Sequence, residues 1–288
     1  MDLVAQLVAN GLVNGSHYAL LALGFGLIFG TTRITHFAYG PIYALSAYGC
    51  WFAAAPLGAP LWLAVIAGIA TGAVAGALAY LVVYRPFERE GSPPLVILIA
   101  SLGLFIVLEN AIGVVFGTDT KVVPAPPAGV FLWGPLVVTS SQLAQVAALV
   151  ILGAGLALYV RRTRFGKAVL AMTDNPEMAR VIGIDTLRVS LAAFVIGSAI
   201  AAVPACLILV KDGATAHMGF AAVFMAFVAV VVGGVGSLRG AVAGGLALGL
   251  VESTGMVKIP TEWQSSIAFV VLFLVLLFRP RGLFGGRQ

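Results

Sequence analysis

The chain has 288 residues, of which 61% are hydrophobic and only 9% are charged. Water-soluble domains contain about 25% charged residues, so this composition excludes a soluble enzyme or a soluble binding module. The net charge of +5 comes from short basic clusters that separate apolar runs. A nucleic-acid-binding surface would instead show a basic stripe with interleaved aromatic residues, so we expect no nucleic-acid partner.

Apolar runs bounded by Gly, Pro or charged residues predict the helices. The first run, Leu3–Phe29, follows Asp2 rather than a basic segment and is too long for a signal peptide, so it predicts a first span. In chain order, the predicted helices cover residues 5–29, 37–55, 61–84, 93–117, 142–160, 189–210 and 263–278. The uncharged stretch Ile34–Tyr84 is long enough to cross a hydrocarbon core twice, since one crossing needs about 20 residues.

The segment 221–255 is apolar, but its composition argues against one continuous helix. Its middle, Gly233–Gly245, reads GGVGSLRGAVAGG, and both the glycine density and Arg239 disfavour a helix there. We expect two half-helices that each cross or a re-entrant hairpin, covered by protein or by a water-filled cavity. The predicted fold class is an all-α polytopic integral membrane protein with about eight to nine transmembrane helices. It forms a single domain, 1–288, with an outer loop at 118–141.

Basic residues predict the orientation of the chain, because cytoplasmic loops are enriched in Lys and Arg. The most basic connection is the segment 161–188, here called the basic loop, with Arg161, Arg162, Arg164, Lys167, Arg180 and Arg188. If the basic loop is cytoplasmic, counting crossings places Arg33 and Arg85 inside as well. The N-terminus is then outside. The C-terminal tail carries Arg279, Arg281 and Arg287, so we expect it in the cytoplasm as well.

The basic loop contains a predicted short helix with both ends marked. Residues suited to those ends stand in order: Asn175 as the cap, Pro176 at the first position, Glu177 against the helix dipole, and Gly183 at the end. Met178, Val181 and Ile182 then share one face, and the upstream stretch Gly166–Met172 is also amphipathic. Two interpretations stay open from the residues alone: an interfacial helix on lipid headgroups, or a docking helix for a cytoplasmic partner.

Polar side chains inside apolar runs are costly and are therefore candidate sites. Glu109 and Asn110 lie in the fourth predicted span. Two interpretations of Glu109 are equally good: its side chain forms a hydrogen bond to another helix, or it faces the substrate pathway. Glu252 lies at the end of the broken segment, and contact with water is the simpler explanation for a charged residue there. Asn14 lies in the first span beside His17.

Small residues in the apolar runs predict packing rather than chemistry. Cys50 and Cys206 are far apart in the sequence, so we expect neither a disulfide nor a C-x-x-C metal or redox pair. Gly68, Gly72 and Gly76, at a spacing of four, predict close contact between helices. No metal site is expected.

The basic loop reads RTRFGKAVLAMTDNPEMARVIGID from Arg162 to Asp185. It resembles the coupling segment of permeases in the branched-chain amino-acid ABC importer family, which share a T-R-x-G-x-A-x-x-A run and a later Gly-Ile pair. The matching positions are Thr163, Arg164, Gly166, Ala168, Ala171, Asp174, Ala179, Gly183 and Ile184. Further segments resemble the same family in the same order: Asn10–Gly30, His36–Tyr48, Gly233–Gly245 and Leu277–Gly285. Together they cover nearly the whole chain.

Within that family, the length and the N-terminus are closer to the LivH-like permeases than to the LivM-like ones. One segment departs from the family pattern. Where the family usually shows F-A-H-G-E, this chain has Phe37, Ala38, Tyr39, Gly40 and Pro41. A titratable pair is thus replaced by a phenol and a proline ring.

The resemblance implies a non-catalytic permease subunit of an ATP-binding-cassette importer in the bacterial cytoplasmic membrane. Its substrates would be branched-chain amino acids or related small polar solutes such as amides and urea. The implied partners are a second homologous permease, two cytoplasmic ATPase subunits, a secreted solute-binding protein and membrane lipid. ATP and Mg would be bound by the ATPase subunits, and this chain would bind no cofactor, since Gly166-Lys167 lacks the glycine that a P-loop needs at position 161.

The residues and the resemblance together suggest roles. ATPase coupling falls to Thr163, Arg164, Gly166, Asp174, Glu177, Met178, Ala179, Ile182 and Gly183. Candidates for the substrate pathway are Asn14, Tyr39, Glu109, Asn110, Gly233, Gly234 and Glu252.

Two other function classes are alternatives to an importer subunit. A secondary transporter or a channel for small solutes is the main alternative, since such proteins also use broken helices and membrane-depth carboxylates. An intramembrane hydrolase would need a nucleophile and a base, and Ser198 with His217 is the available pair. We expect these two residues to lie too far apart for a hydrogen bond.

Overall fold

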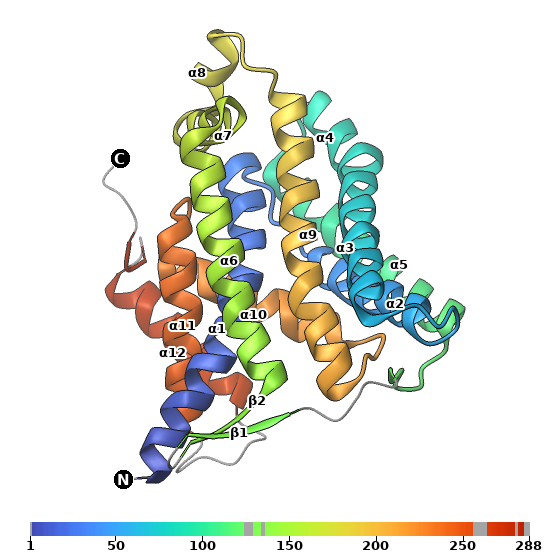
Figure 1. The fold of residues 1–288 in the computed structure, drawn as a ribbon. Helices are drawn as coiled ribbons and strands as arrows, with labels where there is room; N and C mark the ends of the chain where they lie inside the picture. The colour runs from blue at the N-terminus through green and yellow to red at the C-terminus, as the bar shows by residue number, and fades with distance from the viewer. Residues whose placement is uncertain (1, 124–128, 134–135, 256–263, 280–281, 285–288) are drawn as a thin grey trace.

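A computed structural model describes residues 2–123, 129–133, 136–255, 264–279 and 282–284. The described part is mainly helical, and most of the long helices run along one common direction (Figure 1). Helices α7 and α8 lie at one end of the molecule, and the two short strands lie at the other. We call these the loop end and the hairpin end.

The elements follow one another in this order: α1 (Asp2–Thr32), α2 (Tyr39–Ala54), α3 (Leu61–Leu78), η1 (Ala79–Tyr84), α4 (Arg85–Arg89), α5 (Pro94–Phe116), β1 (Val130–Trp133), β2 (Leu136–Thr139), α6 (Ser140–Arg162), α7 (Arg164–Asp174), α8 (Pro176–Val181), α9 (Thr186–Asp212), α10 (Met218–Gly233), α11 (Leu238–Gly255) and α12 (Gln264–Phe278). Strands β1 and β2 pair antiparallel, with Val130 opposite Thr139. These strands lie inside the predicted outer loop, where no strand was expected.

Five helices of the described residues are long and apolar enough to cross a membrane. They are Val4–Thr32, Leu61–Arg89, Pro94–Phe116, Ser140–Arg162 and Thr186–Asp212, and the bent pair α10 and α11 makes a sixth if it counts as one span. The prediction of an all-helical, multi-spanning chain is confirmed, but the count of eight to nine transmembrane helices is not. The difference arises because α2 has only 16 residues and the apolar part of α12 covers only Ser266–Phe278.

Helix α1 lies at the centre and packs most extensively against α11. Glycines spaced four apart on both helices bring the two backbones together, as in membrane proteins generally. A Cβ atom placed at Gly15 would lie only 2.9 Å from the Cα of Leu246. A Cβ at Gly249 would in turn collide with the backbone of Gly15.

The glycine stripe of α3 faces α2 and α9, as its spacing predicted. A Cβ atom at Gly72 would lie 2.5 Å from Ser46 Oγ, and one at Gly68 would lie 2.6 Å from Cys206 Sγ. Cys50 also contacts this position, so the fold brings the two free, buried cysteines together although they are far apart in the sequence. Their predicted role as packing residues is confirmed.

The segment 221–255 is broken, as predicted. Helices α10 and α11 meet at 116° around Gly234 and Gly236, which have φ angles of +108° and +84° that other residues rarely adopt. The C-terminal segment covers this break: the N–H groups of Leu283 and Phe284 donate to the carbonyls of Val232 and Gly233, both at 2.9 Å. Carbonyl groups at a helix end need such partners, so the chain terminus helps to stabilise the break.

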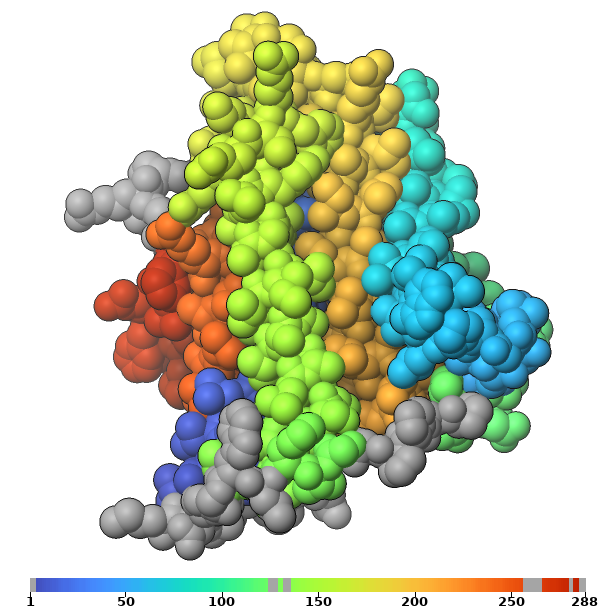
Figure 2. Space-filling model, viewed as in Figure 1, coloured from blue at the N-terminus to red at the C-terminus, as the bar shows by residue number. Residues whose placement is uncertain are grey.

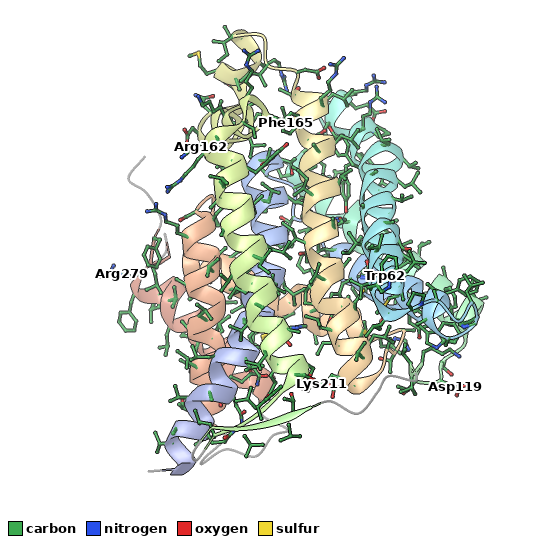
Figure 3. The ribbon with its side chains drawn as sticks, in the orientation of Figure 1. Trp62, Asp119, Arg162, Phe165, Lys211 and Arg279 are labelled. Carbon is green, nitrogen blue, oxygen red and sulfur yellow. The ribbon has the colours of Figure 1, made fainter. Side chains whose placement is uncertain are left out.

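Charged residues are distributed unevenly between the two ends. Arg162 and the neighbouring Phe165 lie at the loop end, whereas Asp119 and Lys211 lie toward the hairpin end (Figure 3). In the space-filling view the basic loop covers the loop end of the molecule, and α6 and α9 run side by side below it (Figure 2). The predicted orientation, with the basic loop in the cytoplasm, rests on this asymmetry and stays a prediction.

Candidate functional site

The basic loop folds into two short helices whose ends are held by side chains. Thr163 Oγ1 accepts a hydrogen bond from the N–H of Gly166 at 2.9 Å and so caps α7. Asn175 Oδ1 accepts from the N–H of Met178 at 3.0 Å and caps α8, and Gly183 ends α8 with a φ angle of +86°. The predicted short helix, its cap and its terminating glycine are therefore confirmed.

Gly166 allows α7 to begin directly after α6. A Cβ atom at this position would collide with the carbonyl oxygens of Tyr159 and Val160. These are backbone atoms and cannot rotate away, so any larger residue would push the two helices apart. This close approach gives a physical reason for glycine at a position that the family resemblance singled out.

The basic loop has an inner face that packs on the bundle. Val169 and Met172 of α7 and Ala179 of α8 are buried, with Ala179 only 2% exposed. All three belong to a cluster that includes Leu23 of α1 and Ala193 of α9. Ala179 therefore stabilises the loop itself and is not available to a partner. The sequence had assigned Ala179 to ATPase coupling without showing which way its side chain points.

The outer face of α8 is apolar and exposed. Met178, Val181 and Ile182 are 56%, 80% and 67% exposed. Glu177 and Arg180 are also exposed, so the apolar face has a charged border. Exposed apolar patches with polar rims are typical of surfaces that bind another molecule.

The inner side of the basic loop contacts both α1 and the break between α10 and α11. Arg33, at the end of α1, donates from Nη2 to the carbonyl oxygen of Thr173 at 3.0 Å. Arg33 has a φ angle of +60°, an uncommon conformation that ends α1 beside α7. A Cβ atom at Gly236 would lie 3.3 Å from Thr173 Cγ2. A displacement of α7 would therefore press on α1 and on the break.

Buried polar groups gather along α1, at its contacts with α11 and α2. Glu252 of α11 is 3% exposed, and its carboxylate interacts with the hydroxyl of Tyr18 on α1. His17 Nε2 lies 3.5 Å from the hydroxyl of Tyr43 on α2. The explanation of Glu252 as a water-exposed helix end is wrong, because its side chain points into the bundle. Asn14 is half-buried one turn from Tyr18.

Tyr39, the departure from the family pattern, is fully buried. Its hydroxyl donates to the carbonyl oxygen of Leu21 at 2.9 Å and lies so close to Gly24 that a Cβ atom there would collide with it. Tyr39 thus links α2 to α1. Gly233 and Gly234 lie at the break described above, where Gly233 packs against the backbone of Gly240.

Glu109 and Asn110 lie away from this cluster. Glu109 Oε1 is 2.8 Å from Nδ1 of His217, whose side chain is 74% exposed. Asn110 is exposed and donates to the carbonyl oxygen of Ile106 in its own helix, at 2.8 Å. The structure therefore gives Glu109 an interhelical partner that the sequence did not identify. No hydrogen bond joins Ser198 to His217 among the described residues, which leaves a hydrolase pair without support.

The sequence of this chain matches a known protein family over most of its length. The family described as branched-chain amino acid transport system permease component matches residues 7–276. This chain belongs to that permease family.

Curated relatives match this permease over almost its full length. The high-affinity branched-chain amino acid transport system permease protein BraD of Pseudomonas aeruginosa is 34% identical over 97% of this chain and 95% of its own. LivH of Escherichia coli K12, which carries the same description, is 34% identical over the same shares. The solved structure of PsaBC from Streptococcus pneumoniae aligns with 98% of this permease and 92% of that chain. That chain is 12% identical to this permease, with a TM-score of 0.48.

One polar network of this permease was not predicted. His36 Nδ1 lies 2.8 Å from the hydroxyl of Tyr84, which donates to Ser101 Oγ at 2.9 Å. Ser101 Oγ in turn accepts from the N–H of Phe37 at 2.7 Å. The network ties the connection between α1 and α2 to η1 and α5. The available signal was a set of polar residues inside apolar runs, but their sequence positions do not show that they meet.

Proposed function

We propose that this chain is a transmembrane subunit of an ATP-driven importer that moves branched-chain amino acids or related small polar solutes into the cell. It would be oriented with the basic loop and C-terminus in the cytoplasm and the N-terminus outside. The observation that carries the proposal is the exposed apolar face of α8, held on an α7 that contacts α1 and the α10–α11 break. Family membership and the substrates in the names of BraD and LivH support the solute class.

The exposed face of α8 suits insertion into a groove on an ATPase subunit. Fully burying a Val, Ile or Met side chain is worth about 1.5–3 kcal/mol. Met178, Val181 and Ile182 together would therefore contribute at most about 5–9 kcal/mol before the costs of association. Because association itself costs about 4–15 kcal/mol, this face would contribute to docking together with other contacts.

The inner contacts of the basic loop suggest how such movement reaches the membrane part. Displacement of α7 would act on α1 through the Arg33 to Thr173 hydrogen bond and on the break through Gly236. Helix α1 packs along α11, which carries Glu252. Rearrangement of α1 and α11 would therefore alter the surroundings of the buried polar cluster, which we propose as part of the substrate pathway. Glu109 is instead proposed to stabilise the hairpin end with His217.

The proposed assembly contains a second homologous permease, two cytoplasmic ATPase subunits and a secreted solute-binding protein. ATP and Mg would be held by the ATPase subunits. This chain would lie in the bacterial cytoplasmic membrane in contact with lipid and would bind no cofactor. Its role would be to convert movement of the docked ATPase subunits into opening and closing of the pathway.

The test is a charge placed on the outer face of α8. Val181→Glu would bury an unpaired carboxylate in the docking interface, which costs roughly 3 kcal/mol, or about 100-fold in affinity. We expect loss of ATPase co-purification and of uptake with normal membrane insertion. Val181→Leu keeps the face apolar and should retain both. Val122→Glu places the same charge at an exposed valine before β1 and should also retain both.

Normal uptake and normal co-purification by Val181→Glu would contradict the docking proposal. An α8 that only lies on lipid headgroups predicts that outcome, since one added acid weakens surface attraction without affecting a partner.

A further inference from the structure

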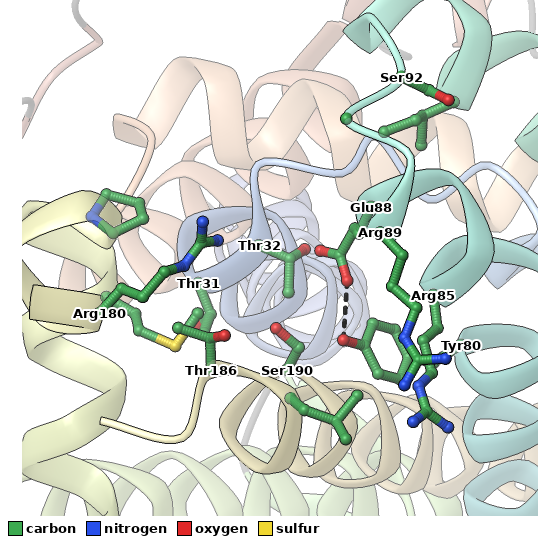
Figure 4. A pocket seen from close by; sticks show the side chains of 15 residues that line it. Thr31, Thr32, Tyr80, Arg85, Glu88, Arg89, Ser92, Arg180, Thr186 and Ser190 are labelled. Atoms are coloured by element: carbon green, nitrogen blue, oxygen red, sulfur yellow. Dashed lines mark hydrogen bonds between the residues drawn. The ribbon is translucent and has the colours of Figure 1, made fainter. Parts of the chain in front are cut away.

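A cavity of about 550 Å³ lies at the loop end, beneath the basic loop. It is lined by the last turn of α1, by η1 and α4, by the start of α5, and by α7, α8 and α9 (Figure 4). Small-molecule sites in proteins occupy about 300–1,000 Å³. The cavity is therefore large enough for a metabolite, and it separates α8 from α4.

Opposite charges face each other across this cavity. Glu88 of α4 projects into it, and the hydroxyl of Tyr80 donates to Glu88 Oε2 at 2.7 Å. Arg180 of α8 points toward Glu88 from the other side and acts on its carboxylate electrostatically. Within the described part of the chain, however, neither Arg180 nor Arg89 forms an ion pair with Glu88.

The remaining lining supplies hydrogen-bonding groups and a small apolar area. Hydroxyl groups come from Thr32, Thr186 and Ser190, and apolar contact comes from Ile97 and Leu187. The Nε atom of Arg85, another lining residue, is buried and has no hydrogen-bond partner among the described residues. Such an orphan donor is costly unless a further group satisfies it.

This arrangement selects the ligand class. A simple anion would be attracted by the arginines but repelled by Glu88. A simple cation would be attracted by Glu88 but repelled by the arginines. A zwitterion satisfies both, with its ammonium group at Glu88 and its anionic group at Arg180. Charge-assisted hydrogen bonds of this kind are about twice as strong as neutral ones.

We propose that the cavity binds a small zwitterion in which an ammonium group stands close to an anionic group, and that a free amino acid from the cytoplasm is the ligand. The assignment of the ligand to the cytoplasmic amino acid rests on the proposed function. That function places this cavity on the cytoplasmic side, where the transported amino acid accumulates. A bound amino acid would join α8 to α4 and resist displacement of the basic loop. The site would thus slow import when the internal amino acid concentration is high.

The experiment uses the complete importer in vesicles of phosphatidylcholine and phosphatidylglycerol, with ATP inside and the binding protein outside. The initial rate of labelled leucine uptake is compared between empty vesicles and vesicles preloaded with unlabelled leucine. We expect preloading to slow the wild type. Glu88→Gln should transport normally into empty vesicles but need about tenfold more internal leucine for half inhibition, since it loses one charge-assisted hydrogen bond. Glu90→Gln, a neighbouring exposed carboxylate outside the cavity, should behave as wild type.

Several outcomes separate the possibilities. Preloading without effect on the wild type, or equal inhibition of Glu88→Gln, would overturn the proposal while ATP-driven uptake still supports the proposed function. The headgroup of phosphatidylethanolamine has the same zwitterionic chemistry, so a second set of vesicles contains that lipid. Slower uptake there without internal leucine, relieved by Glu88→Gln, would assign the site to lipid and overturn the free amino acid as ligand.

Discussion

The contact between α1 and α11 offers the sharpest test of the fold. A Cβ atom at Gly249 would lie 2.6 Å from the carbonyl oxygen of Gly11 and closer still to the backbone of Gly15. Ordinary van der Waals contact begins near 3.4 Å. In Gly249→Ala the two helices must therefore separate by at least about 0.8 Å, which is the difference between these distances for the contact with Gly11, and by more to relieve the closer contact with Gly15, because backbone atoms cannot rotate away.

The expected cost follows from close packing. Overpacking by one carbon typically costs about 1–3 kcal/mol, and a gap of 0.5–1 Å forfeits a quarter to a half of each dispersion contact. The Glu252 to Tyr18 interaction and the hydrogen bond from Ser253 Oγ to Leu7, at 2.7 Å, lie within one turn of Gly249. Both would be stretched, so we expect reduced uptake as well as a melting temperature lower by several degrees.

Thermal unfolding can be followed with a thiol-reactive fluorescent dye. The chain has only two cysteines, Cys50 and Cys206, and both are free and buried, so they react as the helices come apart. Gly103→Ala is the matched control, because a Cβ there meets nothing within 4 Å. It should leave stability unchanged or raise it by up to about 1 kcal/mol. A Gly249→Ala protein as stable as the control would refute the packing argument.

Three further predictions follow from other contacts. Deleting residues 280–288 removes the N–H donors of Leu283 and Phe284 from the α10–α11 break, so uptake should fall while insertion persists; full uptake by the truncated chain would show that the cap is dispensable. Glu109→Gln and His217→Gln should each change stability by less than about 1 kcal/mol, because the His217 side chain is largely exposed and surface pairs contribute little, and the double variant should equal the single ones, whereas additive effects would argue against a pair. In a cysteine-free background, Val122→Cys should react with an impermeant reagent added outside and Val181→Cys should not; the reverse pattern would overturn the orientation.

Features set by local sequence were predictable. The cap at Asn175, the terminating Gly183 and the break around Gly234 depend on conformational preferences that single residues express. The α3 glycine stripe was also readable, because helical spacing places Gly68, Gly72 and Gly76 on one face. These are short-range properties, and the structure confirms them.

Contacts between distant segments were not predictable. Nothing in the local pattern shows that His217 would meet Glu109, or that Glu252 would turn inward to Tyr18. The direction of Ala179 illustrates the same limit, since an alanine suits either face of an amphipathic helix. Only the packing of α8 on the bundle shows that this side chain is internal. The strands β1 and β2 were missed because both lie in a short loop rich in proline and glycine.

The measurement that tests the central claim most directly is the energy source of uptake. The permease is reconstituted with its partner permease and ATPase subunits, and the binding protein is supplied outside. We predict that labelled leucine enters only when ATP is enclosed in the vesicles, and that proton or sodium gradients do not replace ATP. Uptake by the permease without ATPase subunits, driven by such a gradient, would contradict the account and indicate a secondary transporter.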